Sequence, residues 1–200
     1  VWNGSTSGNT DFPFLTTAET VDVSSSDADD TSAGAGLRTV KIFGLDANYD
    51  SLVETVTMNG QSRVTTTGLF LRVNFVQGQT VGATGDNEGD IYVYATSETT
   101  VTAGVPQTAS KLQGKIDLGM GQSTSGIYTV PAGKTLLIQS ITSSLVDSKA
   151  NTIAHLQTKV RDYNESSTNN YNTWRKINEV GLDANSTTFA TREFDIPVRI

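Results

Sequence analysis

Apolar and polar side chains alternate with a period of two along most of this chain. The clearest runs cover residues 69–76, 91–95, 154–161 and 194–200. A period of two places apolar side chains on one side of a β-strand, whereas a helix needs apolar positions three and four residues apart. No window of about a dozen residues carries such a helical stripe without Gly or several Thr. The pattern therefore predicts an all-β protein.

Turn-forming Asp, Asn, Gly and Pro residues divide the chain into many short segments. The predicted strands cover residues 19–24, 37–43, 52–58, 69–77, 90–95, 98–103, 111–118, 126–130, 134–142, 152–162, 172–179 and 187–199. The residues on the apolar sides of the clearest strands form the predicted core: Leu71, Val73, Phe75, Ile91, Val93, Leu136, Ile138, Leu156, Val160, Ile196 and Val198.

Short strands at this spacing are typical of an antiparallel β-sandwich of the jelly-roll or immunoglobulin-like kind. The stretch 96–110 is polar and small and contains Gly104 and Pro106, which favours a domain boundary there. We therefore expect two small sandwich domains in tandem, 19–104 and 105–200. One larger, continuous sandwich is the alternative.

The first 18 residues are predicted to form an extended N-terminal arm. Its large side chains are Trp2, Phe12, Phe14 and Leu15, set among small polar residues. Such anchors in a segment without its own sheet pattern indicate an assembly element that packs on a partner surface. The alternative is that the arm folds back and completes its own domain.

Composition narrows the function classes. Thr and Ser number 30 and 19, and the β-branched Thr suits strands. The net charge is −7, so the protein would repel a phosphate backbone and we expect no nucleic-acid partner. The chain contains no Cys, which excludes disulfides and thiolate metal sites. Its apolar runs are far shorter than the ~20 residues of a membrane helix, and we expect no membrane partner. Since the chain begins with Val1 and stops inside an alternating run at Ile200, we expect the natural protein to extend further.

Residues that could carry chemistry are few. His155 is the single histidine and lies on the polar side of a predicted strand, whereas triads and most zinc sites need a His oriented by a second group. Asp46, Asn48 and Asp50 match the first ligand positions of a calcium loop, but Ser51 and Thr57 replace its Gly and its bidentate Glu. The acidic stretches 27–30 and 86–90 are interpreted as turns. We expect no catalytic residue, no metal and no cofactor.

One set of stretches stands out: Ser24–Thr31, Ala33–Val40, Gly44–Tyr49 and Glu54–Gly60, and more loosely Tyr128–Thr135 and Phe194–Val198. These stretches resemble virion structural proteins of tailed bacteriophages. The resemblance implies a particle protein located in the virion. It carries no catalytic residues.

Three functions follow as expectations. The first is a capsid decoration or cement protein, a homo-oligomer whose partners are its own copies and other virion proteins (the major capsid protein or tail components). The second is a tail, fibre or receptor-binding module in which Tyr163, Tyr171 and Trp174 stack on a host glycan. The third is a β-sandwich polysaccharide hydrolase or lyase, for which no local pair of carboxylates stands out.

Overall fold

The structure is a computed structural model that describes residues 12–144, 153–160, 175–183 and 189–199. The chain divides into two compact units, unit 1 at Val1–Gly133 and unit 2 at Lys134–Ile200. Every strand pair is antiparallel, and the one helix among the described residues is a 3-10 turn at Ala109–Lys111, η1. The prediction of an all-β, antiparallel protein is confirmed.

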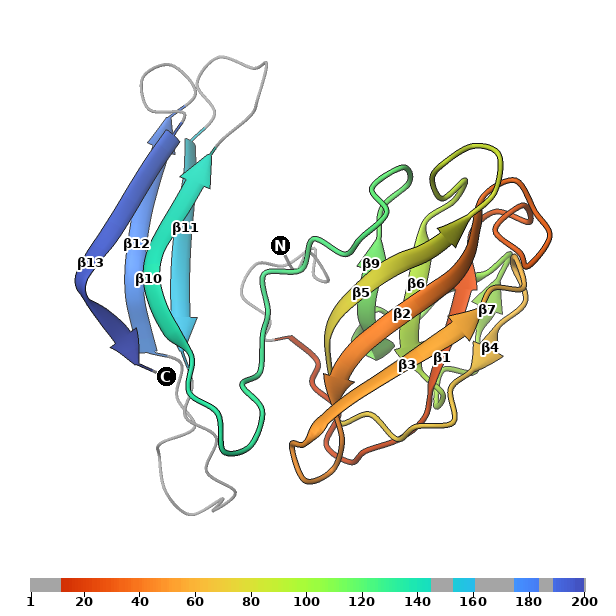
Figure 1. Cartoon of the computed structure of the whole chain (residues 1–200), viewed down its shortest axis with the longest axis horizontal. Helices are drawn as coiled ribbons and strands as arrows, with labels where there is room; N and C mark the ends of the chain where they lie inside the picture. Colours follow the sequence, from red (N-terminus) through yellow and green to blue (C-terminus); the bar gives the residue numbers. More distant parts are fainter. Residues whose placement is uncertain (1–11, 145–152, 161–174, 184–188, 200) are drawn as a thin grey trace. The chain divides into compact units, whose positions relative to one another are not determined.

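Unit 1 contains two larger sheets and a small hairpin (Figure 1). One sheet has the order β4-β1-β6-β9, formed by Val64–Thr65, Val21–Ser25, Ile91–Ala95 and Leu112–Ile116. The other has the order β3-β2-β5, formed by Ser51–Thr57, Leu37–Leu45 and Arg72–Val81. The hairpin joins β7, Val101–Thr102, to β8, Val105–Pro106.

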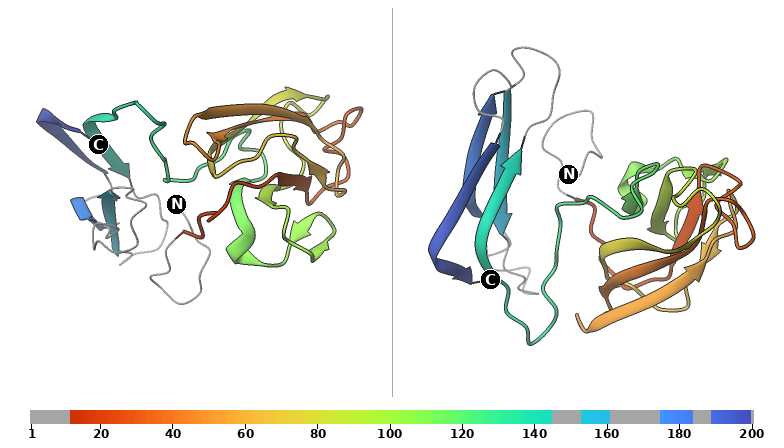
Figure 2. Two further views of the ribbon diagram at one scale, coloured as in Figure 1. Left: turned by 90° about the horizontal axis from the view of Figure 1, so that it is seen from below. Right: turned by 45° about the horizontal axis from the view of Figure 1, so that its top comes forward.

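The two larger sheets lie in separate layers, seen from the side in the left view of Figure 2. Apolar side chains from both layers share one core, which is the arrangement of a β-sandwich. β1, β2 and β6 each contribute alternate residues to it, as a period of two requires. The core consists chiefly of Val21, Val23, Val40, Ile42, Val56, Met58, Phe70, Val73, Val76, Ile91, Val93 and Ile116.

An irregularity between β2 and β5 inverts the faces of β5 part-way along. Phe43 lies opposite Phe75 and Gly44 opposite Val73, so Asn74 is an extra residue in β5. A β-bulge of this kind shifts the alternation by one residue. As a result Val76 is buried and Phe75 is only half-buried, and the prediction of Phe75 as a core residue is wrong.

The other core predictions divide by unit. Leu71, Val73, Ile91 and Val93 are buried as predicted. The predicted core residues of unit 2 with described side chains are half-buried: Leu136, Ile138, Leu156 and Val160. Ile196 and Val198 lie in a strand, but their side chains are outside the described ones.

The division of the chain differs from the predicted boundary at residue 104. β9 pairs with β6 in the same sheet as β1, so residues well beyond 104 complete the first sandwich. The polar stretch 96–110 holds the β7–β8 hairpin and η1. Its composition reflects hairpin turns at the edge of unit 1, and the two units separate after Gly133.

The described residues of unit 2 form two antiparallel strand pairs. β10, Leu137–Ser144, pairs with β13, Phe189–Arg199, and β11, Ile153–Val160, pairs with β12, Arg175–Asp183. The left view of Figure 2 shows the two pairs as separate layers. Arg192 of β13 donates a hydrogen bond to the amide oxygen of Asn178 of β12 at 3.3 Å, linking the pairs.

The bulge gives the first testable prediction. Phe70 is fully buried and Phe75 is half-buried. Phe70→Ala should lower the free energy of unfolding of unit 1 by about 3–5 kcal/mol, the usual cost for a buried Phe. Phe75→Ala should cost clearly less, because its ring already contacts solvent. Urea unfolding of both variants tests this, and equal losses would contradict the face assignment.

Candidate functional site

The predicted N-terminal anchors pack on unit 1 wherever the structure describes them. The rings of Phe12 and Phe14 meet edge to face at a centroid distance of 4.9 Å. Leu15 is buried and belongs to the core, and the Gln113 side chain donates a hydrogen bond of 3.0 Å to the carbonyl of Pro13. Trp2 lies outside the described residues. For Leu15 the structure favours the alternative in which the segment completes its own domain.

A buried arginine holds this segment in place. Arg72 donates hydrogen bonds to the carbonyl oxygens of Leu15 at 2.8 Å and Leu71 at 2.6 Å. Its guanidinium carbon lies 4.7 Å from the ring centre of Phe14 and 5.5 Å from that of Tyr49. Cation–π contacts of a desolvated Arg contribute about 2 kcal/mol. The segment is therefore attached to the sandwich by hydrogen bonds, ring contacts and apolar burial together.

The residues predicted as weak calcium ligands form the hairpin turn between β2 and β3. Asp46 Oδ1 accepts hydrogen bonds from the backbone N–H groups of Asn48 at 2.8 Å and Asp50 at 3.0 Å. This is an Asx turn, in which the carboxylate replaces a backbone acceptor. Tyr49 has a φ of 63°, a left-handed conformation uncommon for a residue with a side chain, and this turn places its ring beside Arg72.

The acidic stretch 27–30 is also a turn, organised by one buried carboxylate. Asp30 accepts hydrogen bonds from Ser25 Oγ and Leu37 N, both at 2.6 Å, and from Glu88 N at 3.0 Å and Gly89 N at 2.9 Å. These four donors occupy both carboxylate oxygens. Among the described residues, no group of three or more His, Cys, Asp or Glu side chains is placed to hold a metal ion.

The third acidic stretch contributes to a surface ion cluster. Lys115 Nζ lies 2.8 Å from Asp90 Oδ2 and 2.7 Å from Asp117 Oδ1. Burial lowers the pKa of Lys115, but its hydrogen bonds to Asp117 and Asp90 outweigh this and raise it to about 12. Burial raises the pKa of Asp90, and the bonds from Lys115 and from the backbone of Leu118 lower it by more. The cluster fixes the 117–121 turn to Asp90, the residue that precedes β6.

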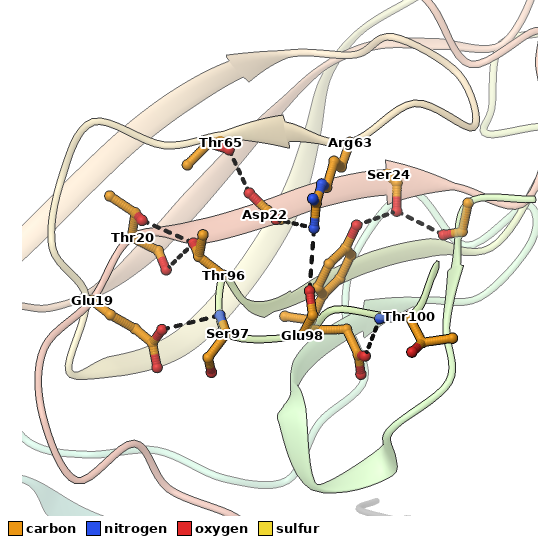
Figure 3. Close-up of polar contacts among 12 residues, drawn as sticks. Glu19, Thr20, Asp22, Ser24, Arg63, Thr65, Thr96, Ser97, Glu98 and Thr100 are labelled. Carbon is orange, nitrogen blue, oxygen red and sulfur yellow. Dashed lines mark hydrogen bonds and ion pairs between the residues drawn. The ribbon is translucent and has the colours of Figure 1, made fainter. Parts of the chain in front are cut away.

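Buried polar side chains join β1 to the neighbouring loops (Figure 3). The buried Asp22 carboxylate accepts a hydrogen bond of 2.5 Å from Thr65 Oγ1 and forms an ion pair of 3.5 Å with Arg63. Arg63 also donates to the carbonyl oxygen of Glu98 at 3.2 Å. Asp22 thus connects β1 to β4, and Arg63 extends the connection to the loop after β6.

The same region contains a buried hydroxyl pair. Ser24 Oγ donates to the carbonyl of Gly104 at 2.6 Å and lies 3.1 Å from the Tyr94 hydroxyl. Because the Ser24 hydrogen is directed at Gly104, the Tyr94 hydroxyl is the donor to Ser24. Burial raises the pKa of Tyr94, which keeps this phenol protonated. The pair therefore locks the β7–β8 turn onto β1.

Glu98 holds the two ends of the segment that carries the β7–β8 hairpin. Its carboxylate accepts hydrogen bonds from the backbone N–H of Thr100 at 2.8 Å and of Thr108 at 2.9 Å. Burial raises the pKa of Glu98, but these bonds outweigh it, and the net pKa is lowered. The buried carboxylates described here therefore hold loops in position.

The outer face of the β3-β2-β5 sheet carries an apolar row that the sequence analysis did not single out. Val53 of β3 and Phe75 of β5 both lie opposite Phe43 of β2, and we call these three residues the Phe43 row. Their neighbours Ile42 and Val76 point into the core, so the row points outward. Val53 is 48% exposed. The sequence does contain a signal for this row: residues 40–43 and 73–76 place apolar side chains on both faces of their strands.

β3 is an edge strand beside this row, at the rim of its sheet in Figure 1. In the part of the chain that the structure describes, the backbone of Ser51–Thr57 is hydrogen-bonded to β2 alone. Its one charged residue is Glu54, whose carboxylate is turned to the N–H groups of Thr67 and Gly68, both at 2.8 Å. The outer edge of β3 and the Phe43 row form the candidate functional site, a surface suited to another β-strand.

Comparisons with known proteins do not identify a relative. No protein-family model matches the chain, and no curated protein or solved structure shows a significant match. In the described ranges, no helix is long and apolar enough to cross a membrane. The glycan-stacking candidates Tyr163, Tyr171 and Trp174 lie outside the described residues, and the side chain of His155 in β11 is not described either.

Leu15 provides a prediction that separates a core role from a role in assembly. Leu15→Ala should lower the free energy of unfolding of unit 1 by about 2–5 kcal/mol, because a buried Leu loses its core contacts. Chemical denaturation of the isolated protein measures this. A loss within experimental error would show that the segment is not part of the core and would restore the interpretation as a free arm.

Glu98 predicts a pH-dependent stability. Its pKa is lowered from 4.5 by folding, so its carboxylate stabilises the native state above that value and the contribution disappears as the pH falls through the folded pKa. Glu98→Gln should therefore lower the free energy of unfolding by about 1–3 kcal/mol at pH 7 and by less at pH 3, below the unfolded pKa. Urea unfolding at both pH values tests this. A difference independent of pH would contradict the role of the charge.

Proposed function

We propose that this protein is a non-enzymatic structural component of a tailed-bacteriophage virion, a decoration or cement protein that binds the capsid shell. The observation that carries the proposal is the open outer edge of β3 beside the Phe43 row. This surface offers backbone donors and acceptors together with apolar side chains. It suits attachment to another protein better than it suits chemistry on a small molecule.

The edge of β3 lacks the usual protection against strand pairing. Exposed edge strands are commonly blocked by Lys, Pro, a bulge or great shortness. β3 has seven residues, Ser-Leu-Val-Glu-Thr-Val-Thr, with no Lys and no Pro. Its single charge, on Glu54, is engaged by the 67–68 backbone. An unprotected edge of this length supports recognition by strand addition.

The Phe43 row adds affinity and orientation to such an edge. Phe43 and Phe75 lie 5.9 Å apart between ring centres, and Lys41 Nζ lies 5.2 Å from the centre of the Phe43 ring. Aromatic side chains, Phe included, are enriched in protein interfaces relative to the rest of the surface. Burial of the still exposed part of Val53 and the two rings would favour binding by roughly 25 cal/mol for each Å² removed from water.

The interior of unit 1 supports a structural role. Asp30 and Glu98 are buried, and the hydrogen bonds they accept come from the chain itself. Catalytic carboxylates, in contrast, keep an oxygen available for substrate or water. The net charge of −7 favours solubility at the high local concentration of a particle surface.

Cryo-electron microscopy of the intact particle tests the location. We expect density for this chain on the head lattice, with the edge of β3 against the shell. Density on the tail would replace the decoration role with the tail or fibre alternative. Absence of the chain from purified particles would contradict the proposal altogether.

Binding of the purified protein to shells that lack it tests the surface. Val53→Glu should weaken shell binding roughly tenfold or more, the effect of about 1.4 kcal/mol, because it places a charge in the Phe43 row. Val81→Glu is the matched control, since Val81 is a similarly exposed residue of the same sheet (41% against 48%) outside the row. Equal binding of the two variants would remove the Phe43 row from the interface.

A further inference from the structure

Unit 2 differs from unit 1 in how little of it is buried. Among its residues with described side chains, only Leu182 and Asn178 are buried. The strands nevertheless alternate as a sandwich does: β10 reads exposed and half-buried in turn through most of its length. Leu137 at its start is 56% exposed. The apolar sides of these strands are formed but incompletely covered.

Half-buried apolar residues occur on all four strands. They belong to both strand pairs, so neither layer is fully covered by the other. The members with described side chains are Ile138, Ile141, Leu156, Val160, Ile177, Val180 and Phe194. Two-stranded sheets are marginally stable by themselves and gain stability when further strands or layers cover them.

The strand edges of unit 2 are open as well. Among the described residues its sheets have two strands each, and each of these four strands forms backbone hydrogen bonds with one neighbour. The strands are 8 to 11 residues long. Long unpaired edges next to apolar faces are the features that lead to strand pairing between chains.

The distribution of charge indicates what covers these surfaces. Residues 1–133 contain 6 Lys and Arg against 14 Asp and Glu, a net charge of −8, whereas residues 134–200 contain 8 against 7, a net charge of +1. Copies of unit 1 repel one another, while copies of unit 2 meet with almost no electrostatic cost. A strongly charged partner would gain little from the nearly neutral unit 2. A second copy of unit 2 is itself nearly neutral, so its charge matches that of the surface it would cover. It also has the same open edges and apolar sides.

We infer that unit 2 is the self-association module of this protein, and that its strand edges and apolar sides are covered by unit 2 of other copies. The acidic sandwich of unit 1, with the Phe43 row and the edge of β3, remains available for a different surface. The inference rests on the proposed assembly role, because it names the part of the chain that contacts its own copies. It is tested without particles, so its failure is distinguishable from failure of shell binding.

The oligomeric state of the full chain is the test. Sedimentation velocity and light scattering over a range of concentrations should show a multimer that dissociates on dilution. Ile138→Glu should raise the dissociation constant roughly tenfold or more, because Ile138 lies on the half-buried apolar side that a second copy would cover. An unchanged near-ultraviolet dichroism spectrum shows that the variant is folded. Leu118→Glu is the matched control: Leu118 is 61% exposed in unit 1, and the variant should keep the wild-type mass.

Amide hydrogen exchange locates the contact in the unmodified protein. Raising the concentration through the association range should slow exchange in residues 137–144, 153–160, 175–183 and 189–199, with little change in β1 to β9. A monomer at all concentrations, protection confined to unit 1, or a folded Ile138→Glu variant that associates like the wild type would each overturn the inference. Val53→Glu should leave the oligomer intact, which separates this surface from the Phe43 row.

Discussion

The carboxylate of Asp30 is the contact on which one end of unit 1 depends. It binds Ser25 and Leu37, on either side of the β1–β2 connection, and also the backbone of Glu88 and Gly89 before β6. The backbone carbonyl oxygen of Asp30 accepts a further hydrogen bond from the N–H group of Gly60. Three connections that are far apart in sequence thus converge on one buried residue. Removing the carboxylate would leave several buried donors without a partner, each costing about 1–3 kcal/mol.

Asp22, Arg63 and Glu98 apply the same principle at the side of the sandwich. Each binds loop backbone or a side chain of a neighbouring strand. These hydrogen bonds hold the loops against the strands. A sandwich fixed in this way can present the edge of β3 and the Phe43 row without rearrangement, which reduces the entropy lost on binding. Several acidic residues that resemble ligand-binding residues in the sequence instead accept hydrogen bonds that hold turns and loops in place.

In the proposed role, the two units would divide the work of a particle protein between them. Unit 1 is internally satisfied and acidic, whereas unit 2 has half-covered apolar sides, open edges and nearly balanced charge. The physical difference is in core size. Two sheets of three and four strands enclose a core in unit 1, while two strand pairs leave their apolar sides partly exposed. If unit 2 associates as inferred above, its stability is coupled to assembly, whereas the stability of unit 1 is not.

Local sequence determined most of the strands and turns, but residues 126–130, also predicted as a strand, do not form one. The period of two located β2, β3, β5, β6, β10, β11 and β13, because alternation is the direct consequence of a pleated strand with one buried side. The Asp46 turn followed from the side chain's bond to its own backbone. Only tertiary structure decided the rest. The pairing of β5 with β2 makes Asn74 an extra residue in β5. Because of this bulge, Val76 and not Phe75 lies in the core.

Leu15 became a core residue through contacts with strands that follow it at long range. The division after Gly133 depended on β9 joining β6. Pairing partners, bulges and the covering of a face depend on residues that are distant in sequence. A single strand's pattern determines that a face is apolar, and the whole fold determines what covers it.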